Sequence, residues 1–482
     1  MEIILIGVEE MPNLLKERLV YVLNRDNNNY LEMVNFFLDP DISLFDKEKK
    51  STQFLKNEFE LLNDANADID FPQSLSEIKQ WTANKQQHIY SEYKAYLNRR
   101  QNGQHREYFN SVSHVFEFLI KIAPVKKVDG AWLYSLTNYW SDADFRELIS
   151  IYLEELGQGL ARANHVKLYN DLLQSLGLEH FEGFLEDRYY HQPAIQLALS
   201  YASPEFIPEI VGFNLGYEQL PLHLLITNYE LKELGIDSHY FNVHITIDNH
   251  DSGHAAQSIQ AVEKIAQKYK NKDEFYHKLR RGYALNDRGV SSTQIVKDLN
   301  LNEMIINIFK RKALVGRYVH NDKCKFMEKT INQWLNDPEQ ISIFLDILKN
   351  KNWIKTGEDP ELSRFWTMIN DVDGKMYGVF NSAEKQMIYD WIANATYAEY
   401  SKEKKNISIT HPELHDYSFA YLGDEQLKEL KRKIELESNI ASKVNTLIPY
   451  LAPHLHHTEV GLWSTYQYVR YLFPQLIMKA HI

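Results

Sequence analysis

The stretch that most constrains this chain is Tyr240–Ala256, which reads YFNVHITIDNHDSGHAA. It places three histidines and two aspartates within eleven positions, from His244 to His254. Because an α-helix turns about 100° per residue, four of these side chains would share one broad helical face: His244, Asp248, Asp251 and His254. Imidazoles and carboxylates on a buried face are costly unless they pair or bind a metal. Mixed nitrogen and oxygen ligands suit iron, manganese or zinc.

The residues around this stretch predict one long buried helix. Asp237 or Ser238 is an N-cap residue type, and apolar or small residues continue at helical spacing through Lys268. His250 would lie roughly a third of a turn away from the polar face. The sequence therefore predicts a continuous helix over residues 237–268.

Composition excludes several classes of protein. The chain has 482 residues, 44% of them hydrophobic, and a net charge of −13, which argues against a nucleic-acid partner. No apolar run is long enough for a membrane span, and the N-terminus lacks the features of a signal peptide. The single cysteine, Cys324, excludes an internal disulfide and a thiolate cluster. We therefore expect a cytoplasmic protein that would hold any metal through histidines and carboxylates.

The hydrophobic pattern repeats at helical spacing along the chain, and strand signals are sparse, so the predicted class is all-α. We expect a helical N-terminal region of unknown role (1–105), a metal-binding bundle (106–270) and a helical C-terminal region (271–482). The first boundary follows the polar segment NRRQNGQ, where Gly103 is a break signal. The next apolar segment, from Val112, predicts a helix that ends at Pro124.

Candidate metal ligands lie on two further helical segments. Glu155 is at the end of one helix, and His165 follows ten residues later, past a Gly-Gln-Gly break. Another segment carries Glu209 and Glu218. Carboxylates from separate helices, together with histidines at helical spacing, are how helical bundles build di-iron or di-manganese sites. Open coordination positions on such ions admit O₂ or substrate.

These motifs resemble the heme-oxygenase-like diiron oxidases, also called iron-containing redox enzymes. The resemblance rests on FLIKIAP and VDGAWL within Phe118–Leu133, ELGQG…H at Glu155–His165, LGYE at Leu215–Glu218, and YFxxHxxxD followed by GHA within Tyr240–Ala255. It covers roughly Tyr108 to Tyr269, about a third of the chain. Neither flank is included.

The resemblance implies a seven-helix bundle of heme-oxygenase type that binds two Fe(II) ions per chain and uses O₂ as co-substrate. In that family a Glu and a His come from one helical segment, a Glu from a second, and a His-Asp-His set from a third. Carried over to this chain, the metal ligands are Glu155, His165, Glu218, His244, Asp248 and either Asp251 or His254. Members of the family oxidise amino-acid-like or fatty-acid-like substrates.

Two positions depart from the family pattern. The family usually has a histidine three residues after the aspartate, where this chain has Asp251, and His254 lies one turn further on. Either Asp251 replaces that histidine, or a π-type bulge brings His254 into the site. Glu209 is a rival to Glu218, because the family spacing falls between the two. These departures leave the binding of the second metal open.

The predicted function is that of a non-heme diiron, O₂-dependent oxidase or oxygenase acting on a small amine, amino-acid or carboxylate substrate. N-oxygenation and oxidative C–C cleavage are the reactions that the resemblance implies. Two other functions stay open: a non-catalytic helical scaffold, and a heme-dependent or cofactor-free oxidase on the same bundle. The aromatic-rich flanks favour a homodimer. HLHH at His454–His457 is a zinc candidate, although a helix start beside Pro453 also explains it.

Overall fold

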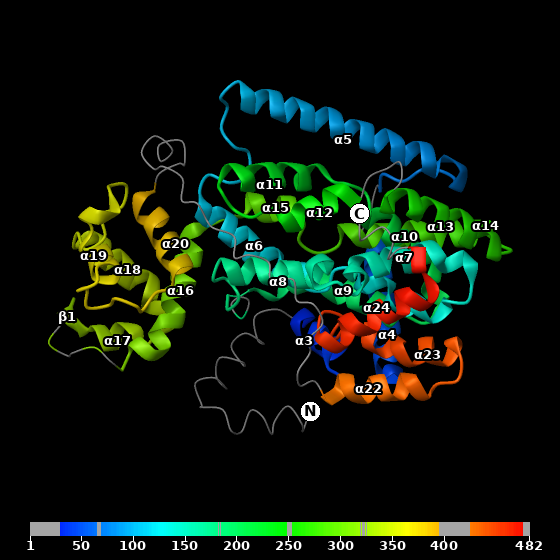
Figure 1. The fold of residues 1–482 in the computed structure, drawn as a ribbon. Helices are drawn as coiled ribbons and strands as arrows, with labels where there is room; N and C mark the ends of the chain where they lie inside the picture. Colours follow the sequence, from blue (N-terminus) through cyan, green and yellow to red (C-terminus); the bar gives the residue numbers. More distant parts are fainter. Residues whose placement is uncertain are drawn as a thin grey trace.

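A computed structural model of the chain describes residues 29–64, 69–181, 183, 185–247, 253–318, 320, 323, 325–394 and 425–475. These residues fold almost entirely into helices, which confirms the predicted all-α class (Figure 1). The strands in the described ranges are β1 (Lys325–Phe326) and β2 (Lys329–Thr330), which pair antiparallel. None of the described helices is both long and apolar enough to cross a lipid bilayer.

The elements follow one another along the chain in this order. The α-helices are α3 (Tyr30–Leu38), α4 (Leu44–Asp64), α5 (Ile78–Gln101), α6 (Val112–Lys126), α7 (Arg146–Glu155), α8 (His165–Ser175), α9 (His191–Ser200), α10 (Ile207–Tyr217), α11 (Leu222–Glu233), α12 (His239–Ile247), α13 (His254–Lys268), α14 (Lys272–Ala284), α15 (Ser292–Lys297), α16 (Leu301–Gly316), α17 (Ile331–Leu335), α18 (Ile341–Asn350), α19 (Arg364–Asn370), α20 (Ser382–Ala393), α22 (Glu425–Leu436), α23 (Ile440–Leu447) and α24 (Glu459–Leu472). The 3₁₀ turns are η1 (Leu75–Glu77), η2 (Ala131–Tyr139), η3 (Ala143–Phe145), η4 (Gly157–Gly159), η5 (Ala161–Ala163), η7 (Asp187–Tyr190), η8 (Pro204–Phe206), η9 (Leu285–Asp287), η10 (Pro338–Gln340), η11 (Pro360–Leu362) and η12 (Ile448–Leu451).

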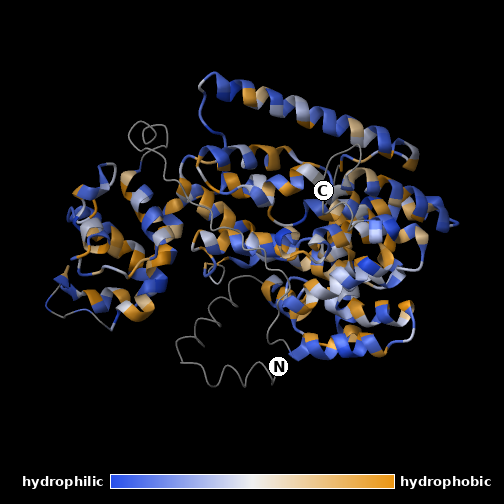
Figure 2. Cartoon of the chain, in the orientation of Figure 1, coloured by the Kyte–Doolittle hydropathy of each residue, from blue (hydrophilic) through white to orange (hydrophobic). Residues whose placement is uncertain are grey.

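Helices from both ends of the chain share a hydrophobic core with the middle segment. α3 and α4 pack on α9, and α24 packs on the η4 turn. One continuous cluster of buried apolar side chains includes members from residues 34–78, 128–285 and 427–473. In Figure 2 the apolar residues of these helices gather where the helices face one another. The core therefore runs across both predicted boundaries, at 105/106 and 270/271.

A second hydrophobic cluster connects the bundle to the lobe formed by α16–α20, on the left in Figure 1. Its members come from residues 109–123, 169–189, 220–241 and 295–392. α6 packs against α16 and α20, and Ser113 donates a 2.6 Å hydrogen bond to the buried carboxylate of Asp390. α6 thus serves both the bundle and the lobe.

Two predicted helix boundaries are wrong. The predicted helix over 237–268 is two helices, α12 and α13, because Gly253 adopts an extended conformation (φ −90°, ψ −161°) directly before α13. Glycine disfavours a helix interior, since it loses more backbone entropy than other residues. α6 continues past Pro124 to Lys126, although proline lacks the N–H that would bond to the carbonyl of residue 120.

Candidate metal centre

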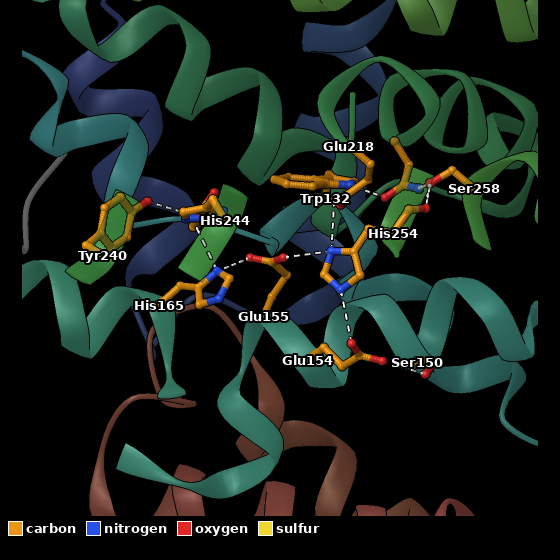
Figure 3. A network of polar contacts seen from close by, with 12 residues as sticks. Trp132, Ser150, Glu154, Glu155, His165, Glu218, Tyr240, His244, His254 and Ser258 are labelled. Carbon is orange, nitrogen blue, oxygen red and sulfur yellow. Dashed lines mark hydrogen bonds and ion pairs between the residues drawn. The ribbon is translucent and has the colours of Figure 1, made fainter. Parts of the chain in front are cut away.

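Six buried side chains form two adjoining groups of potential metal ligands within the described part of the chain. The ligand atoms of each group lie within 4.8 Å of one another. The first group is Asp129, Glu155, His165 and His244, and the second is Glu155, Glu218 and His254. Figure 3 shows five of these residues pointing toward one another around Glu155. Glu155 belongs to both groups.

The first ligand group converges on a small space between η2, α7, α8 and α12. His165 Nδ1 lies 2.5 Å from Glu155 Oε2 and 3.9 Å from Asp129 Oδ2. His244 Nε2 lies 3.3 Å from the same Asp129 oxygen. The two imidazole rings are 4.4 Å apart and inclined by 64°. Two nitrogens and two carboxylates therefore face one point.

The second ligand group lies on the other side of Glu155. His254 Nδ1 is 3.0 Å from Glu218 Oε2 and 3.4 Å from Glu155 Oε1. The two oxygens of Glu155 therefore face different groups: Oε2 faces the first and Oε1 the second. This is the arrangement of a carboxylate that bridges two cations.

The spacing and the unsatisfied atoms fit a metal. First-row divalent cations bind nitrogen and oxygen ligands at about 2.0–2.2 Å, so two ligand atoms of one ion lie no more than about 4.4 Å apart. Within the described residues, Asp129 Oδ1 is buried without a hydrogen-bond partner, and the close contact between Glu155 Oε2 and His165 Nδ1 lacks full hydrogen-bond geometry. Buried polar atoms are normally satisfied, so a metal ion would complete this set.

Gly130 allows Asp129 and Glu155 to approach each other. Its φ is +77°, a backbone conformation that L side chains rarely adopt. A Cβ atom at this position would lie 2.8 Å from the Cβ of Glu155. Any side chain at residue 130 would therefore push Glu155 away from the first ligand group.

The turn between α7 and α8 is closed by Asn164, which is fully buried. Its Oδ1 accepts a 3.0 Å hydrogen bond from the Lys167 backbone N–H and caps α8, which begins at His165. Its Nδ2 donates to the carbonyl of Leu156, one residue after Glu155. Gly157 (φ +63°) makes this turn possible, since a Cβ there would lie 2.3 Å from the Asn164 nitrogen.

The C-terminal segment reaches the same turn. The buried His456 places Nδ1 3.1 Å from Asn164 Nδ2, which donates to it. Burial, reinforced by the neighbouring His457 and His454, holds the pKa of His456 well below its ordinary value, so its ring is neutral and accepts this bond. HLHH is not among the metal-capable groups of the described residues. One of its histidines instead supports the turn that joins Glu155 to His165.

Further hydrogen bonds fix the orientation of His254. Its Nε2 lies 3.3 Å from Glu154 Oε2; with a proton held on Nε2 by this carboxylate, Nδ1 would be available to bind a metal ion in the second ligand group. Trp132 Nε1–H donates to Asn214, Asn214 donates to Ser258, and Ser258 donates to the backbone carbonyl of His254. This chain connects η2, α10 and the first turn of α13 (Figure 3).

The pKa shifts of Glu155 and His165 indicate an ion pair at the centre. Burial raises the pKa of Glu155, but the charges of His165 and His254 outweigh it, and the net pKa lies well below the ordinary value. Burial lowers the pKa of His165, but Glu155 outweighs it and the net pKa is raised. A protonated imidazole therefore faces an ionised carboxylate. A metal ion would take the place of that proton, since metal-bound histidine is neutral.

The structure brings together five of the seven predicted ligands: Glu155, His165, Glu218, His244 and His254. The other two, Asp248 and Asp251, lie outside the described residues, as does His250. His254 enters the second group directly as the first residue of α13. That Asp248, Asp251 and the five residues brought together here bind a metal stays a prediction.

Asp129 is the member that sequence reasoning missed, and Glu209 is the rival that lies elsewhere. Asp129 precedes η2 and accepts a 2.8 Å hydrogen bond from the Tyr240 hydroxyl. An ionisable residue inside the apolar run VDGAWL was the available signal. Glu209 is fully buried and pairs with Arg281, whose Nε donates at 2.8 Å. Glu218, and not Glu209, therefore lies with the ligand groups.

Comparison with known families agrees with this site. Residues 116–287 match the family of iron-containing redox enzymes. This segment belongs to that family. The match confirms the family predicted from the four motifs, its heme-oxygenase-like all-α fold, and an iron-dependent oxidoreductase activity. It includes the predicted ligands and Asp129, and it extends beyond the predicted bundle to residue 287, into the predicted C-terminal region. No curated protein and no solved structure shows significant similarity to the chain.

Proposed function

We propose that this chain is a non-heme diiron enzyme that uses O₂ to oxidise a small amine, amino-acid or carboxylate substrate. The observation that carries the proposal is Glu155, whose two oxygens face two separate ligand groups. Asp129, His165 and His244 complete the first group, and Glu218 and His254 complete the second. Two irons, one on each side of Glu155, would use every member of both groups.

The protein's own residues would orient the ligands and exclude water. When bound, a pair of Fe(II) ions supplies electrons and open coordination positions for reaction with O₂. Glu154 holds the His254 tautomer, and Tyr240 holds Asp129. Such outer hydrogen bonds fix the direction of metal ligands. All six side chains of the two groups are buried, so bulk water has little access to the reacting atoms.

A heme-dependent oxidase fits the geometry less well. Heme needs one axial histidine and a largely apolar pocket. Here the candidate axial histidines, His165 and His254, each contact buried carboxylates, and three carboxylates lie within the two groups. Ionised carboxylates against a porphyrin face would be left without compensating charge. The geometry therefore favours bare metal ions.

The test is iron-dependent O₂ uptake. Protein loaded with Fe(II) under anaerobic conditions should bind two irons per chain and consume O₂ on mixing with air-saturated buffer. Glu155→Ala should lose both iron and O₂ uptake, because both groups lose a ligand. His191→Gln is the matched control, because His191 is a buried histidine that pairs with Glu58, away from both groups.

Three outcomes would contradict the proposal. Wild-type protein that binds no iron would remove the metal centre altogether. Protein that binds two irons but consumes no O₂ would leave a metal site without the proposed chemistry. Retention of iron by Glu155→Ala would show that Glu155 does not connect the two groups.

A further inference from the structure

An ammonium group lies at the edge of the metal centre. Lys126 is in the last turn of α6, three residues before Asp129. Its Nζ lies 5.7 Å from the ring centroid of Tyr240 and 5.9 Å from that of Tyr217. The Tyr240 hydroxyl donates to Asp129, and its ring is 4.8 Å from that of His244. One tyrosine therefore separates Lys126 from the first ligand group.

The charge of Lys126 acts on this region without being neutralised by contact. Burial raises the pKa of Asp129, and Lys126 is the strongest of the charges that outweigh burial and lower it. Burial, with a further contribution from Lys126, lowers the pKa of the half-buried His223 to about 4. Among the described residues, no carboxylate oxygen lies within 4.0 Å of the Lys126 ammonium. A half-buried cation without such a contact favours binding of an external anion.

Polar groups of two other helices face the same region. Tyr217 is the last residue of α10, and burial, together with the charges of Asp129, Glu155 and Glu218, raises the pKa of its hydroxyl. Gln196 of α9 is fully buried beside Tyr217, close enough for its amide to influence the hydroxyl. Within the described residues the Gln196 amide makes no hydrogen bond of full geometry, and the Tyr217 hydroxyl is the polar group that it contacts. A ligand that completed the hydrogen bonds of this buried amide would therefore be stabilised by it.

We propose that Lys126 receives the carboxylate of the substrate beside the metal centre, with the Gln196 amide and the Tyr217 side chain in the same subsite. This inference rests on the proposed function and narrows its substrate class. An ammonium attracts a carboxylate through a charge-assisted hydrogen bond and repels a cationic amine. A carboxylic acid or an amino acid bound through its carboxylate would therefore be accepted, and a simple amine rejected.

Lys127 provides an internal comparison. It is the next residue, the C-cap of α6, and equally placed to interact with the negative end of the helix dipole. Its charge acts on His457 of the C-terminal segment instead of Asp129. If Lys126 served only the helix end, the two lysines would be equivalent.

The test compares an anion with its neutral isostere on the iron-loaded full chain. Hexanoate and hexanamide are titrated calorimetrically under anaerobic conditions into wild type, Lys126→Gln, Lys126→Arg and Lys127→Gln, with iron measured on each sample. Wild type and Lys127→Gln should bind hexanoate at least tenfold more tightly than hexanamide. Lys126→Arg should keep this preference, and Lys126→Gln should lose it with its iron unchanged.

Each other result overturns the inference. A hexanoate preference that survives in Lys126→Gln would place the anion on the metal or elsewhere. Equal binding of the two probes by wild type, or binding of neither, would exclude an anion subsite. Loss of iron from Lys126→Gln would make Lys126 a structural part of the centre. Wild-type protein that binds no iron would contradict the proposed function itself. Iron-loaded wild-type protein that binds hexanoate and hexanamide equally would contradict only the Lys126 inference.

Discussion

Replacing Asn164 by alanine should weaken both the fold and the metal centre. Asn164 caps α8, bonds to the carbonyl of Leu156 and bonds to His456, while Glu155 and His165 lie on either side of the turn that it closes. Loss of this one side chain therefore loosens the two ligand-bearing helix ends and the C-terminal segment together. No other single hydrogen-bonding side chain discussed above joins these three parts.

The magnitude follows from the contacts that are lost. Removing an N-cap side chain costs about 1 kcal/mol of stability. Removing the donor leaves the Leu156 carbonyl and His456 Nδ1 buried without that partner, at about 1–3 kcal/mol. The free energy of unfolding of the metal-free protein should therefore fall by about 2–4 kcal/mol. Iron affinity should fall by about 10- to 100-fold, the usual effect of losing support around metal ligands.

Urea unfolding of the metal-free protein measures the first quantity, and competition with a chromogenic chelator for Fe(II) measures the second. Asn439→Ala is the matched control, because Asn439 caps α23 through a 2.9 Å bond from the Ser442 N–H at an exposed position. The control should lose about 1 kcal/mol and no iron affinity. If Asn164→Ala behaved like Asn439→Ala in both assays, Asn164 would be an ordinary cap and the reasoning would be refuted.

Three further predictions concern the ligands, their support and pH. In metal analysis, Glu218→Gln should reduce bound iron from two ions per chain toward one. Glu209→Gln should keep both ions and only lower thermal stability, since Glu209 pairs with Arg281. Equal iron loss in both variants would contradict the assignment of Glu218 as a ligand. Tyr240→Phe should lower Fe(II) affinity about tenfold in chelator competition with unchanged circular dichroism, because Asp129 loses its donor, and unaltered affinity would count against that role. Burial lowers the pKa of His454 to about 4, so only the unfolded chain gains this proton as pH falls from about 6.5 toward 4. Unfolding free energy should drop in that window by clearly less than about 1.4 kcal/mol per pH unit, because solvent screens the exposed part of the ring, and urea titrations of His454→Gln should show a flatter dependence; an unchanged slope would exclude His454 as a source.

The ligands that carry a local pattern could be predicted from sequence. The end of α7 places Glu155 before a Gly-Gln-Gly turn, and His165 opens the next helix, as their spacing indicated. His244 and His254 were predicted from a helical stripe that does not exist, because Gly253 separates their helices. They still reach the site, since α12 packs on α8 and α13 packs on α7. The residue types were right, while the geometry assumed for them was wrong.

Long-range partners could not be predicted. Asp129 reaches the site from the turn before η2, where no periodic pattern indicates the direction of a side chain. His456 contacts Asn164 across 292 positions of sequence, so HLHH was interpreted as a local cluster. Such contacts depend on how helices dock, which is set by the whole core and not by the residues within one window. The same limit applies to the segments outside residues 116–287, which share the core of the bundle although the family match does not include them.

The most direct test of the central claim is a crystal structure of the Fe(II)-loaded protein with anomalous data collected at the iron edge. Two anomalous peaks are predicted, one between Glu155, His165, His244 and Asp129 and the other between Glu155, Glu218 and His254. Both peaks should contact the Glu155 carboxylate, one through each oxygen. A single peak, or two peaks that do not share Glu155, would contradict the assignment of a diiron centre bridged by this residue.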